Sequence, residues 1–534
     1  MLERELKLHV PAASAAAIEN ELRRAGATHI ALRARYFDTQ DKDLARAGVA
    51  LRVRLEGGQW VQTAKGPGPD ELTRIEINHP RARPELDISL YTGTVLEPLF
   101  LRLGKPLMAR YETCIDRLVL RQAGSCGVVE LALDQGTIRA GQLELPVCEL
   151  ELEQIDGDTD HLFTLGQRWL TRHSLILDFR SKAERGSLLG DLAPANQSAS
   201  GPDQPPRQAN SDFRPLFAPQ HARPVTLKAG MSLRQAYLQC ANECLNQIVR
   251  NAALLATMQN PGADVDLRIE YVHQLRVGIR RLRSCWTLFS KWMNIDLTEF
   301  GAQLRPYFTL LGHVRNNDVI HSTPVPGLSE AGMPELAQMA IASAGAPGAQ
   351  DALALAASAP FQSTLLELLK HLVQQAESSP ENTLAYPPGV AATAPVDGVM
   401  LGQALSKRLN KWLRRLCRDG RMFDQLSIDA RHDLRKQVKR VRYGLEFSQG
   451  VLQQKKLIRV RAALSGIQKI LGDLNDLYVA QDYYQALAAD QPQAFFALGW
   501  LKAMQTQKQA LAKKAFARLE RAGRVKPVKP TARA

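Results

Sequence analysis

Charged and apolar residues alternate along several short segments within the first 190 residues. Residues 3–7 (Glu-Arg-Glu-Leu-Lys) and residues 51–55 (Leu-Arg-Val-Arg-Leu) place a charge at every second position. Segments 74–77, 128–134 and 148–153 repeat the device with Leu, Val or Ile between the charges, and Gly57-Gly58 supplies a hairpin turn. Alternate side chains of an extended strand share one face. The pattern therefore predicts antiparallel strands with one charged and one apolar face.

Such strands favour a barrel that is polar inside and apolar outside. A single Glu-x-Glu-x-Lys segment is also typical of any half-exposed strand, so the prediction of a barrel depends on the repetition of the pattern. Carboxylate oxygens ligate Mg²⁺ or Mn²⁺, and lysine or arginine neutralises phosphate oxygens. A lumen with both kinds of group indicates a guest as charged as a metal-bound phosphate chain.

Beyond about residue 223 the apolar residues recur at helical spacing, and the helical part contains a repeat. Residues 431–442 resemble residues 272–283 (Val-His-Gln-Leu-Arg-Val-Gly-Ile-Arg-Arg-Leu-Arg). Leu471-Gly472 likewise corresponds to Leu311-Gly312, and we expect a turn at both pairs. The repeat predicts two similar four-helix bundles, at about 225–320 and 400–520.

Each repeat carries basic residues on one helix face, at positions i, i+3, i+7 and i+10. A charged outer face is also ordinary for a surface helix, and a histidine can simply cap a helix. Four bases without an acid repel one another, however, and the arrangement occurs twice, which favours an anion-binding face. The candidate residues are His273, Arg276, Arg280, Arg283, His432, Arg435, Lys439 and Arg442.

Charge divides the chain unevenly. Residues 1–190 contain 25 Lys and Arg against 27 Asp and Glu, whereas the rest of the 534 residues contains 43 against 27. A basic excess in one half indicates a polyanion partner for that half. That partner could be nucleic acid, an acidic membrane surface or polyphosphate. Aromatic residues make up only 6% of the chain and no nucleic-acid reader motif is present, so nucleic acid is the less expected of these partners.

Composition also marks the boundaries. The sequence predicts a barrel domain at 1–190, a flexible Pro- and Ser-rich linker at 191–223, a helical domain at 224–520 and a disordered basic tail at 521–534. The charged N-terminus, the lack of a long apolar run and seven scattered cysteines predict a cytoplasmic protein without a membrane span.

The first domain resembles the CYTH domains, or triphosphate tunnel metalloenzymes. The resemblance rests on ordered motifs: Glu3-x-Glu5-x-Lys7, Tyr36-Phe37-Asp38-Thr39, Leu51-Arg52-x-Arg54, Gln62-Thr63-x-Lys65, Arg74-x-Glu76, Asp134-x-Gly136, Glu149-x-Glu151-x-Glu153 and Ser181-Lys182-Ala183. It implies an eight-stranded antiparallel tunnel that hydrolyses a linear triphosphate with Mg²⁺ or Mn²⁺.

Position in these motifs implies roles for individual residues. The metal-side carboxylates would be Glu3, Glu5, Asp134, Glu149 and Glu151, with Glu76 and Glu153 as further candidates. The phosphate clamp would be Lys7, Arg52, Arg54, Lys65, Arg74, Arg117 and Lys182, and the catalytic residues Glu149, Glu151 and Lys65. Glu149 or Glu151 could ligate metal or orient the water as a base. The stretch 110–118 departs from the family pattern, so either Arg117 or Arg110 enters the tunnel.

The repeats resemble the CHAD domain over about residues 225–520, which implies two bundles with basic faces that bind polyphosphate. Together the two resemblances imply an α+β multidomain inorganic triphosphatase with a polyphosphate-binding module. The alternatives are a thiamine or nucleoside triphosphatase, an adenylate cyclase-like enzyme, and a polyphosphate scaffold without activity.

Overall fold

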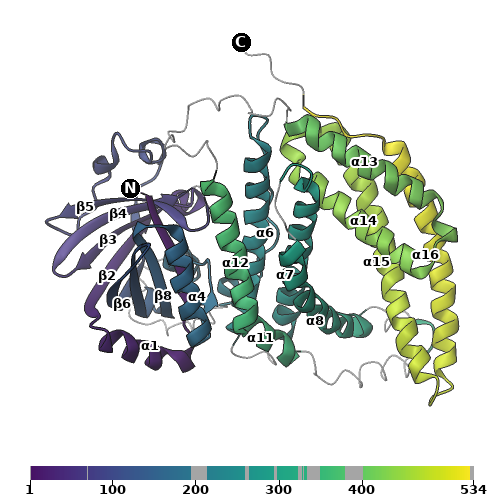
Figure 1. The fold of residues 1–534 in the computed structure, drawn as a ribbon, viewed down its shortest axis with the longest axis horizontal. Helices are drawn as coiled ribbons and strands as arrows, with labels where there is room; N and C mark the ends of the chain where they lie inside the picture. The colour runs from purple at the N-terminus through teal and green to yellow at the C-terminus, as the bar shows by residue number, and fades with distance from the viewer. Residues whose placement is uncertain are drawn as a thin grey trace, which may run out of the picture. The chain divides into compact units, whose positions relative to one another are not determined.

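The computed structural model describes residues 2–68, 70–193, 213–258, 264–293, 298–322, 328, 330–333, 349–378 and 401–528. The chain divides into two compact units (Figure 1). Unit 1 comprises residues 1–220, 249–259 and 354–390, and unit 2 comprises residues 221–248, 260–353 and 391–534.

Unit 1 is built around a closed barrel of eight antiparallel strands, which confirms the predicted fold. Their order is β5-β4-β3-β2-β6-β7-β8-β1, and β1 closes the ring by pairing with β5 through Leu2↔Ile75 and Arg4↔Thr73. A short β9 (Ile176–Leu177) also pairs with β1. The barrel strands are β1 (Leu2–His9), β2 (Thr28–Asp38), β3 (Ala50–Glu56), β4 (Gln59–Pro67), β5 (Thr73–Arg81), β6 (Met108–Gly124), β7 (Gly127–Ala140) and β8 (Leu143–Gly157).

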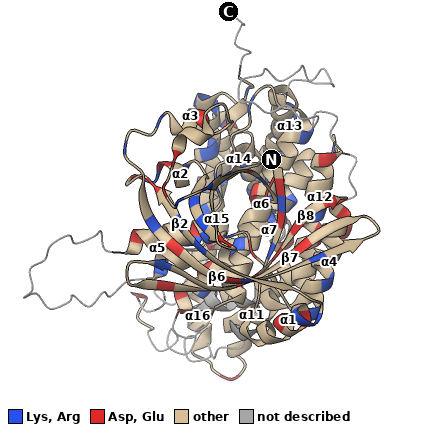
Figure 2. Ribbon diagram, turned by 90° about the vertical axis from the view of Figure 1, so that its left-hand side faces the viewer, with Lys and Arg blue, Asp and Glu red and all other residues tan. Residues whose placement is uncertain are grey.

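Strand β1 turns its charged residues inward and its leucines outward. Leu6 and Leu8 are fully buried. A Cβ at Gly166 of helix α4 (Thr159–His173) would lie 2.4 Å from Leu6 Cδ2, so Leu6 packs directly beneath that helix. Glu5 and Lys7, one position out of phase, occupy the opposite face. Figure 2 shows the ring of strands with acidic and basic positions along it.

Helices cover the apolar outer surface of the barrel. Besides α4 they are α1 (Ala12–Arg24) and the short α2 (Asp43–Arg46) and α3 (Glu97–Phe100). Helix α5 (Lys182–Leu192) instead packs against the face of β6 that carries Tyr111 and Arg117. Helix α5 starts at Ser181, whose hydroxyl accepts from the Glu184 N–H. The Tyr111 hydroxyl donates to the Ala183 carbonyl at 2.9 Å, which fixes the first turn of α5 against β6.

Helix α12 (Ala359–Glu377) also belongs to unit 1, following α11 (Ala349–Ala357). The Gln362 side chain accepts from the Leu177 N–H of β9 at 2.9 Å. At the other end of α12, Glu377 receives hydrogen bonds from Arg4 at 2.5 Å and from the Thr159 hydroxyl at 2.6 Å. Helix α12 therefore covers β9 and α4 from outside the barrel.

Unit 2 is helical. Its second repeat comprises four helices, α13 (Leu401–Arg421), α14 (Ile428–Phe447), α15 (Gln454–Leu487) and α16 (Ala494–Ala522). The first repeat contains α6 (Leu233–Ala256), α7 (Val265–Phe289) and α8 (Thr298–Ser322) within the described residues. Helices α7 and α14, which carry the two copies of the basic pattern, pack against each other.

Three expectations need correction. Leu311-Gly312 and Leu471-Gly472 are not turns, because they lie inside α8 and α15. Gly312 instead leaves room for Arg276, whose Nη1 would be 2.9 Å from a Cβ at that position. The expected disordered tail is ordered to residue 528, since Leu452 bridges to Pro527.

The end of the predicted linker has a defined structure. Residues 194–212 lie outside the described residues, but residues 213–223 are described. Leu216 of a 3-10 turn (Arg214–Phe217) is buried in the same apolar cluster as Tyr36 and Tyr111. A leucine that packs this way gives the end of the predicted linker a fixed position.

A search of the described helices for membrane-spanning character finds no single helix that is long and apolar enough. Asp351–Ala357 and Ala359–Glu377 pass that test only as a pair bent by 49°.

The packing of α5 yields a stability prediction. A Cβ at Gly186 would lie 2.2 Å from the Tyr111 ring, so Gly186→Ala should push α5 away from β6. We expect a loss of about 1–3 kcal/mol, the usual cost of overpacking, although alanine favours a helix by about 1 kcal/mol. Thermal unfolding measures it. Gly104→Ala, with nothing within 4 Å, is the control, and an equal effect of both changes would refute the argument.

Candidate functional site

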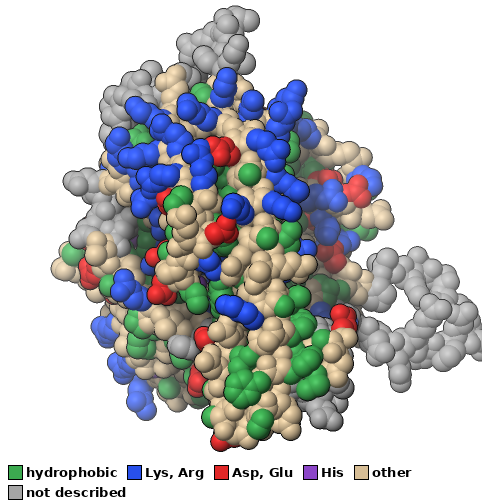
Figure 3. Space-filling model, turned by 90° about the vertical axis from the view of Figure 1, so that its right-hand side faces the viewer, with side chains coloured by type: hydrophobic (Ala, Val, Ile, Leu, Met, Phe, Trp, Pro, Cys, Tyr) green, Lys and Arg blue, Asp and Glu red, His purple; other side chains and the backbone are tan. Residues whose placement is uncertain are grey.

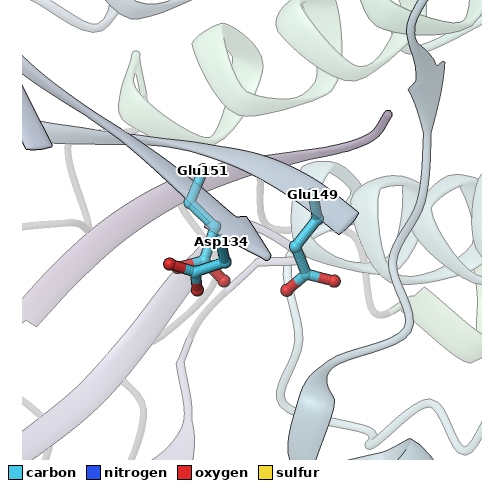
Figure 4. Close-up of side chains that lie close together, drawn as sticks. All are labelled: Asp134, Glu149 and Glu151. Atoms are coloured by element: carbon cyan, nitrogen blue, oxygen red, sulfur yellow. The ribbon is translucent and has the colours of Figure 1, made fainter. Parts of the chain in front are cut away.

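Three buried carboxylates meet inside the barrel. Asp134 on β7 pairs in register with Glu149 on β8, and Glu151 lies two residues further along the same face of β8. One oxygen from each lies within 4.8 Å of the others, and Figure 4 shows the three side chains pointing toward the same region. Asp134 is 0% and Glu149 3% exposed. Hard oxygen donors so close together, and so free of water, fit a divalent cation such as Mg²⁺ or Mn²⁺.

Lys182 and Arg117 are two of the bases that neutralise this cluster. Lys182 Nζ lies 2.6 Å from Asp134 Oδ2 and 2.8 Å from Glu151 Oε1. Arg117 contacts Asp134 at 2.6 Å through Nε and Glu151 at 2.7 Å through Nη2. Burial alone would raise the pKa of Asp134, but Lys182 and Arg117 outweigh it and hold that pKa below its usual value. Asp134 is therefore ionised, and Lys182, Lys7 and Arg117 likewise outweigh burial and lower the pKa of Glu151.

The lumen face of β1 joins the cluster through two lysines. Lys7 Nζ lies 2.9 Å from Glu5 and 3.0 Å from Glu151. Lys65 of β4 lies 2.8 Å from Glu5 and 2.6 Å from Glu3. These contacts link Glu5 and Glu3 to the three carboxylates, so the acids of β1, β7 and β8 form one network.

Three further carboxylates near this network, Glu3, Glu76 and Glu153, differ in their pKa. Burial and a hydrogen bond with Glu76 raise the pKa of Glu3 to about 9. For Glu76, burial is outweighed by the Glu3 hydrogen bond and by nearby cations, so its pKa falls to about 2. Burial, with repulsion from Glu5 and Glu130, raises the pKa of Glu153 to about 7. Glu3 and Glu76 thus share one proton, which lowers the charge the barrel must contain.

Two arginines on β3 differ from the other bases because no carboxylate of the metal cluster neutralises them. Arg52 donates to the Tyr36 hydroxyl at 3.3 Å, and Arg54 donates to Glu56 at 2.6 Å. In the part of the chain that the structure describes, the buried Nε atoms of both have no acceptor. Burial and repulsion from Arg52 lower the pKa of Arg54 to about 10. Unsatisfied buried donors of this kind call for an anion.

The structure brings most of the predicted tunnel residues together. Arg117, not Arg110, enters the lumen, since Arg110 pairs with Asp191 at 3.1 Å beside α5. Arg74 is held differently from the other clamp candidates. Its guanidinium donates to the carbonyls of Asp70 and Thr73 at the start of β5.

Arg185 is a site residue that the sequence reading missed. It lies one helical turn after the start of α5 and contacts Glu149, the same carboxylate that Lys182 reaches. Its spacing of three residues from Lys182 would have revealed it once a helix was assumed there.

In unit 2 the predicted basic residues lie on α7 and α14. Arg276 donates to the Phe308 carbonyl at 3.0 Å and lies over the Phe308 ring. Arg280 and Arg442 each keep a buried Nε without an acceptor among the described residues. Burial, together with Lys436 and Arg435, lowers the pKa of His432, so this imidazole is neutral near pH 7.

Arginines of several helices also converge in unit 2. Burial and repulsion from Arg283 and Arg415 lower the pKa of Arg440. Burial and repulsion from Arg305 lower that of Arg283. Helices α7, α8, α13 and α14 therefore each contribute a guanidinium to one positively charged region.

A second basic surface of unit 2 was not predicted. Exposed bases recur along α13 at four- and three-residue steps, with further bases on the C-terminal half of α16, against which α13 packs. Figure 3 shows Lys and Arg gathered on this face. Its members are Lys407, Lys411, Arg414, Arg418, Lys514, Arg518 and Arg521. The signal was present in the sequence, but the repeat drew attention to α7 and α14.

The fold and the lumen define a charged antiparallel tunnel followed by a helical domain, and comparison with known families agrees. Residues 1–187 match the CYTH domain, and residues 239–485 match the CHAD domain. The chain thus combines an N-terminal CYTH domain with a C-terminal CHAD domain.

Individual relatives were also compared. The chain is 29% identical to an inorganic triphosphatase from Haemophilus influenzae over 163 residues, which is 29% of this chain and 45% of that protein. The match thus spans less than half of the relative. Among solved structures, the CHAD domain from the plant Ricinus communis is 26% identical, covering 58% of this chain and 99% of its own, with a TM-score of 0.45. A Pyrococcus horikoshii protein is 19% identical, covering 34% and 96%, with a TM-score of 0.24.

The raised pKa of Glu153 predicts a pH-dependent stability. The pKa of Glu153 in the folded state is about 7, above the usual 4.5. Ionisation of Glu153 therefore destabilises the folded protein, and the protein loses stability as pH rises from 4.5 to 7. Glu153→Gln should therefore raise the unfolding temperature by about 2–4 °C at pH 8 and leave it unchanged at pH 4.5.

The control is Glu144→Gln on the same strand, where Glu144 pairs with Arg139 at the surface. A Glu153→Gln effect that is equal at both pH values would contradict the assignment.

Proposed function

We propose that the CYTH domain hydrolyses inorganic tripolyphosphate to pyrophosphate and phosphate with Mg²⁺ or Mn²⁺. The observation that carries the proposal is the pair Arg52 and Arg54, whose buried donors lack acceptors in a lumen that also holds a carboxylate cluster. Both side chains lie on the strand face that points to the carboxylate cluster, and their Nε atoms remain available to an anion in that lumen. A polyphosphate anion accompanied by a cation supplies both missing partners.

Each set of residues then has a task. Asp134, Glu149 and Glu151, together with Glu5 and Glu3, would hold the cation, which when bound polarises phosphate oxygens and lowers the pKa of a coordinated water. Arg52 and Arg54 grip phosphate oxygens bidentately. Lys7, Lys65, Lys182 and Arg117 leave their carboxylates in part and turn toward the phosphate chain.

Hydrolysis is an in-line displacement. The water oxygen attacks the terminal phosphorus, the bridging P–O bond breaks, and pyrophosphate departs with the bond electrons. Glu149 or Glu151 accepts the proton of the water. Lys182, within reach of both carboxylates, offsets the charge that this transfer moves. Position and charge supply the catalysis without a covalent intermediate.

The central prediction concerns Glu5, which lies between Lys7 and Lys65. We expect wild type to release phosphate from tripolyphosphate only with Mg²⁺ or Mn²⁺, and Glu5→Gln to lose about 10²–10³ in kcat/KM. Chelation should abolish turnover and added metal restore it. Glu112→Gln is the control, because Glu112 pairs with Arg35 on the exposed side of β6.

The substrate panel separates the alternatives. Pyrophosphate, long-chain polyphosphate, ATP and thiamine triphosphate are assayed beside tripolyphosphate. Faster turnover of ATP or thiamine triphosphate would replace the inorganic substrate with an organic one. Binding without turnover of any member would leave a scaffold instead of an enzyme.

We also propose that the CHAD domain binds inorganic polyphosphate along α7 and α14. The proximity of Arg283, Arg305, Arg415 and Arg440 supports this, because a polyanion relieves the mutual repulsion of these exposed guanidiniums. A phosphate chain needs charge neutralisation and no base stacking, in keeping with the few aromatic residues.

The two basic surfaces make the prediction specific. Changing Arg280 and Arg442 to Gln should weaken polyphosphate binding about tenfold and lower the slope of log affinity against log salt by about two, as expected for two lost phosphate contacts. Fluorescence anisotropy with labelled polyphosphate measures both. Lys411→Gln with Arg414→Gln on the α13 face is the matched control. The opposite ranking of the two double variants would move the site to α13.

A further inference from the structure

The motif Tyr36-Phe37-Asp38-Thr39 has two different parts. Asp38 accepts hydrogen bonds from the Leu44 and Ala45 N–H groups, both at 2.9 Å, and so fixes the start of α2. Its role is therefore structural. Tyr36 lies on β2 directly opposite Arg52 of β3, which makes it a neighbour of the phosphate clamp.

The position of the Tyr36 ring is closely fixed. Its face stacks on Tyr111 with ring centroids 4.6 Å apart and planes 16° apart. The residue is 4% exposed. Tyr111 in turn donates to Ala183 of α5, next to Lys182. The hydroxyl of Tyr36 is thus aimed by packing rather than left to rotate into solvent.

The surroundings of that hydroxyl are cationic. Burial would raise the pKa of Tyr36, but Arg52, Lys182 and Arg54 outweigh it and lower that pKa from its usual value. The stacked Tyr111 behaves oppositely, since burial and its neighbours Tyr36 and Asp38 raise its pKa well above normal. Of the two stacked rings, only Tyr36 presents its hydroxyl to the clamp.

The Tyr36 hydroxyl accepts a hydrogen bond but donates none among the described residues. Arg52 Nη1 donates to the hydroxyl oxygen at 3.3 Å, which leaves the O–H proton. The charged groups nearest to it are donors, and among the described residues no acceptor receives that proton. A buried donor aimed at a group of cations is well placed for an anion that those cations attract.

We propose that Tyr36 is a substrate-binding residue of the tunnel, whose hydroxyl accepts from Arg52 and donates to a phosphate oxygen of the bound chain. The inference rests on the proposed function of the barrel and adds a neutral donor to its charged clamp. Because a neutral hydroxyl brings no charge, it binds phosphate without further repulsion among Arg52, Arg54 and Lys182.

The test is Tyr36→Phe, which removes the hydroxyl and keeps the stacked ring. A contact made equally in the ground and transition states changes KM and not kcat. We expect KM for tripolyphosphate to rise about tenfold, with kcat within a factor of two. Calorimetric titration of tripolyphosphate into metal-free protein should show a similar loss of affinity.

Two further changes make the result specific. Tyr91→Phe is the matched control, because Tyr91 is also fully buried and stacked, on Phe100, away from the clamp. It should leave KM unchanged. In an Arg52→Lys background, Tyr36→Phe should still raise KM, since the contact with phosphate is direct. No further rise there would mean that Tyr36 only holds Arg52, which overturns the proposal.

The outcomes distinguish this inference from the proposed function. Wild-type turnover with an unchanged KM and affinity in Tyr36→Phe would refute the Tyr36 contact and leave the triphosphatase intact. Wild type that neither binds nor hydrolyses tripolyphosphate would refute both. A tenfold rise in Tyr36→Phe that recurs in the Arg52→Lys background and is absent from Tyr91→Phe would establish the contact.

Discussion

The structure of unit 1 depends on the compensation of charges that the barrel removes from water. The single side chain of Lys182 contacts all three carboxylates, Asp134, Glu149 and Glu151, which are nearly or fully buried. Removing one partner from such a buried group typically costs about 3–5 kcal/mol, because the charge left behind is unpaired. Strand register, the inward direction of the charges and the start of α5 at Ser181 are all required to keep these partners in contact.

The same compensation explains how the tunnel could bind and release a guest. In the structure the lysines neutralise the carboxylates that a cation would otherwise occupy. A cation alone would have to displace those lysines, and a phosphate chain alone would meet the carboxylates. Bound together, they exchange one set of ion pairs for another without leaving any buried charge alone. Under the proposed function, Arg52 and Arg54, which bind no carboxylate of the cluster, would provide the first attachment for the anion.

Much of this arrangement could be predicted from the sequence. The period of two in residues 3–7 and 149–153 fixes which side chains share a face, and a barrel follows because those faces are charged. The contacts that could not be predicted depend on the placement of segments distant in sequence. Arg185 reaches Glu149 only because Tyr111 and Gly186 fix α5, and α12 joins unit 1 through Gln362. The turn expected at Leu311-Gly312 was wrong, because Gly312 lies inside a helix, where it makes room for Arg276.

Sharing of the lysines between carboxylates and phosphate makes the binding of metal and phosphate interdependent, and calorimetry tests that directly. Titration of Mn²⁺ into the full chain, with and without saturating tripolyphosphate, measures the coupling between the two sites after subtraction of metal binding by free tripolyphosphate. The account predicts that the anion raises the affinity for Mn²⁺ at least tenfold, about 1.4 kcal/mol of coupling. An affinity for Mn²⁺ that is the same with and without the anion would contradict it, because the lysines would then not be shared between carboxylates and phosphate.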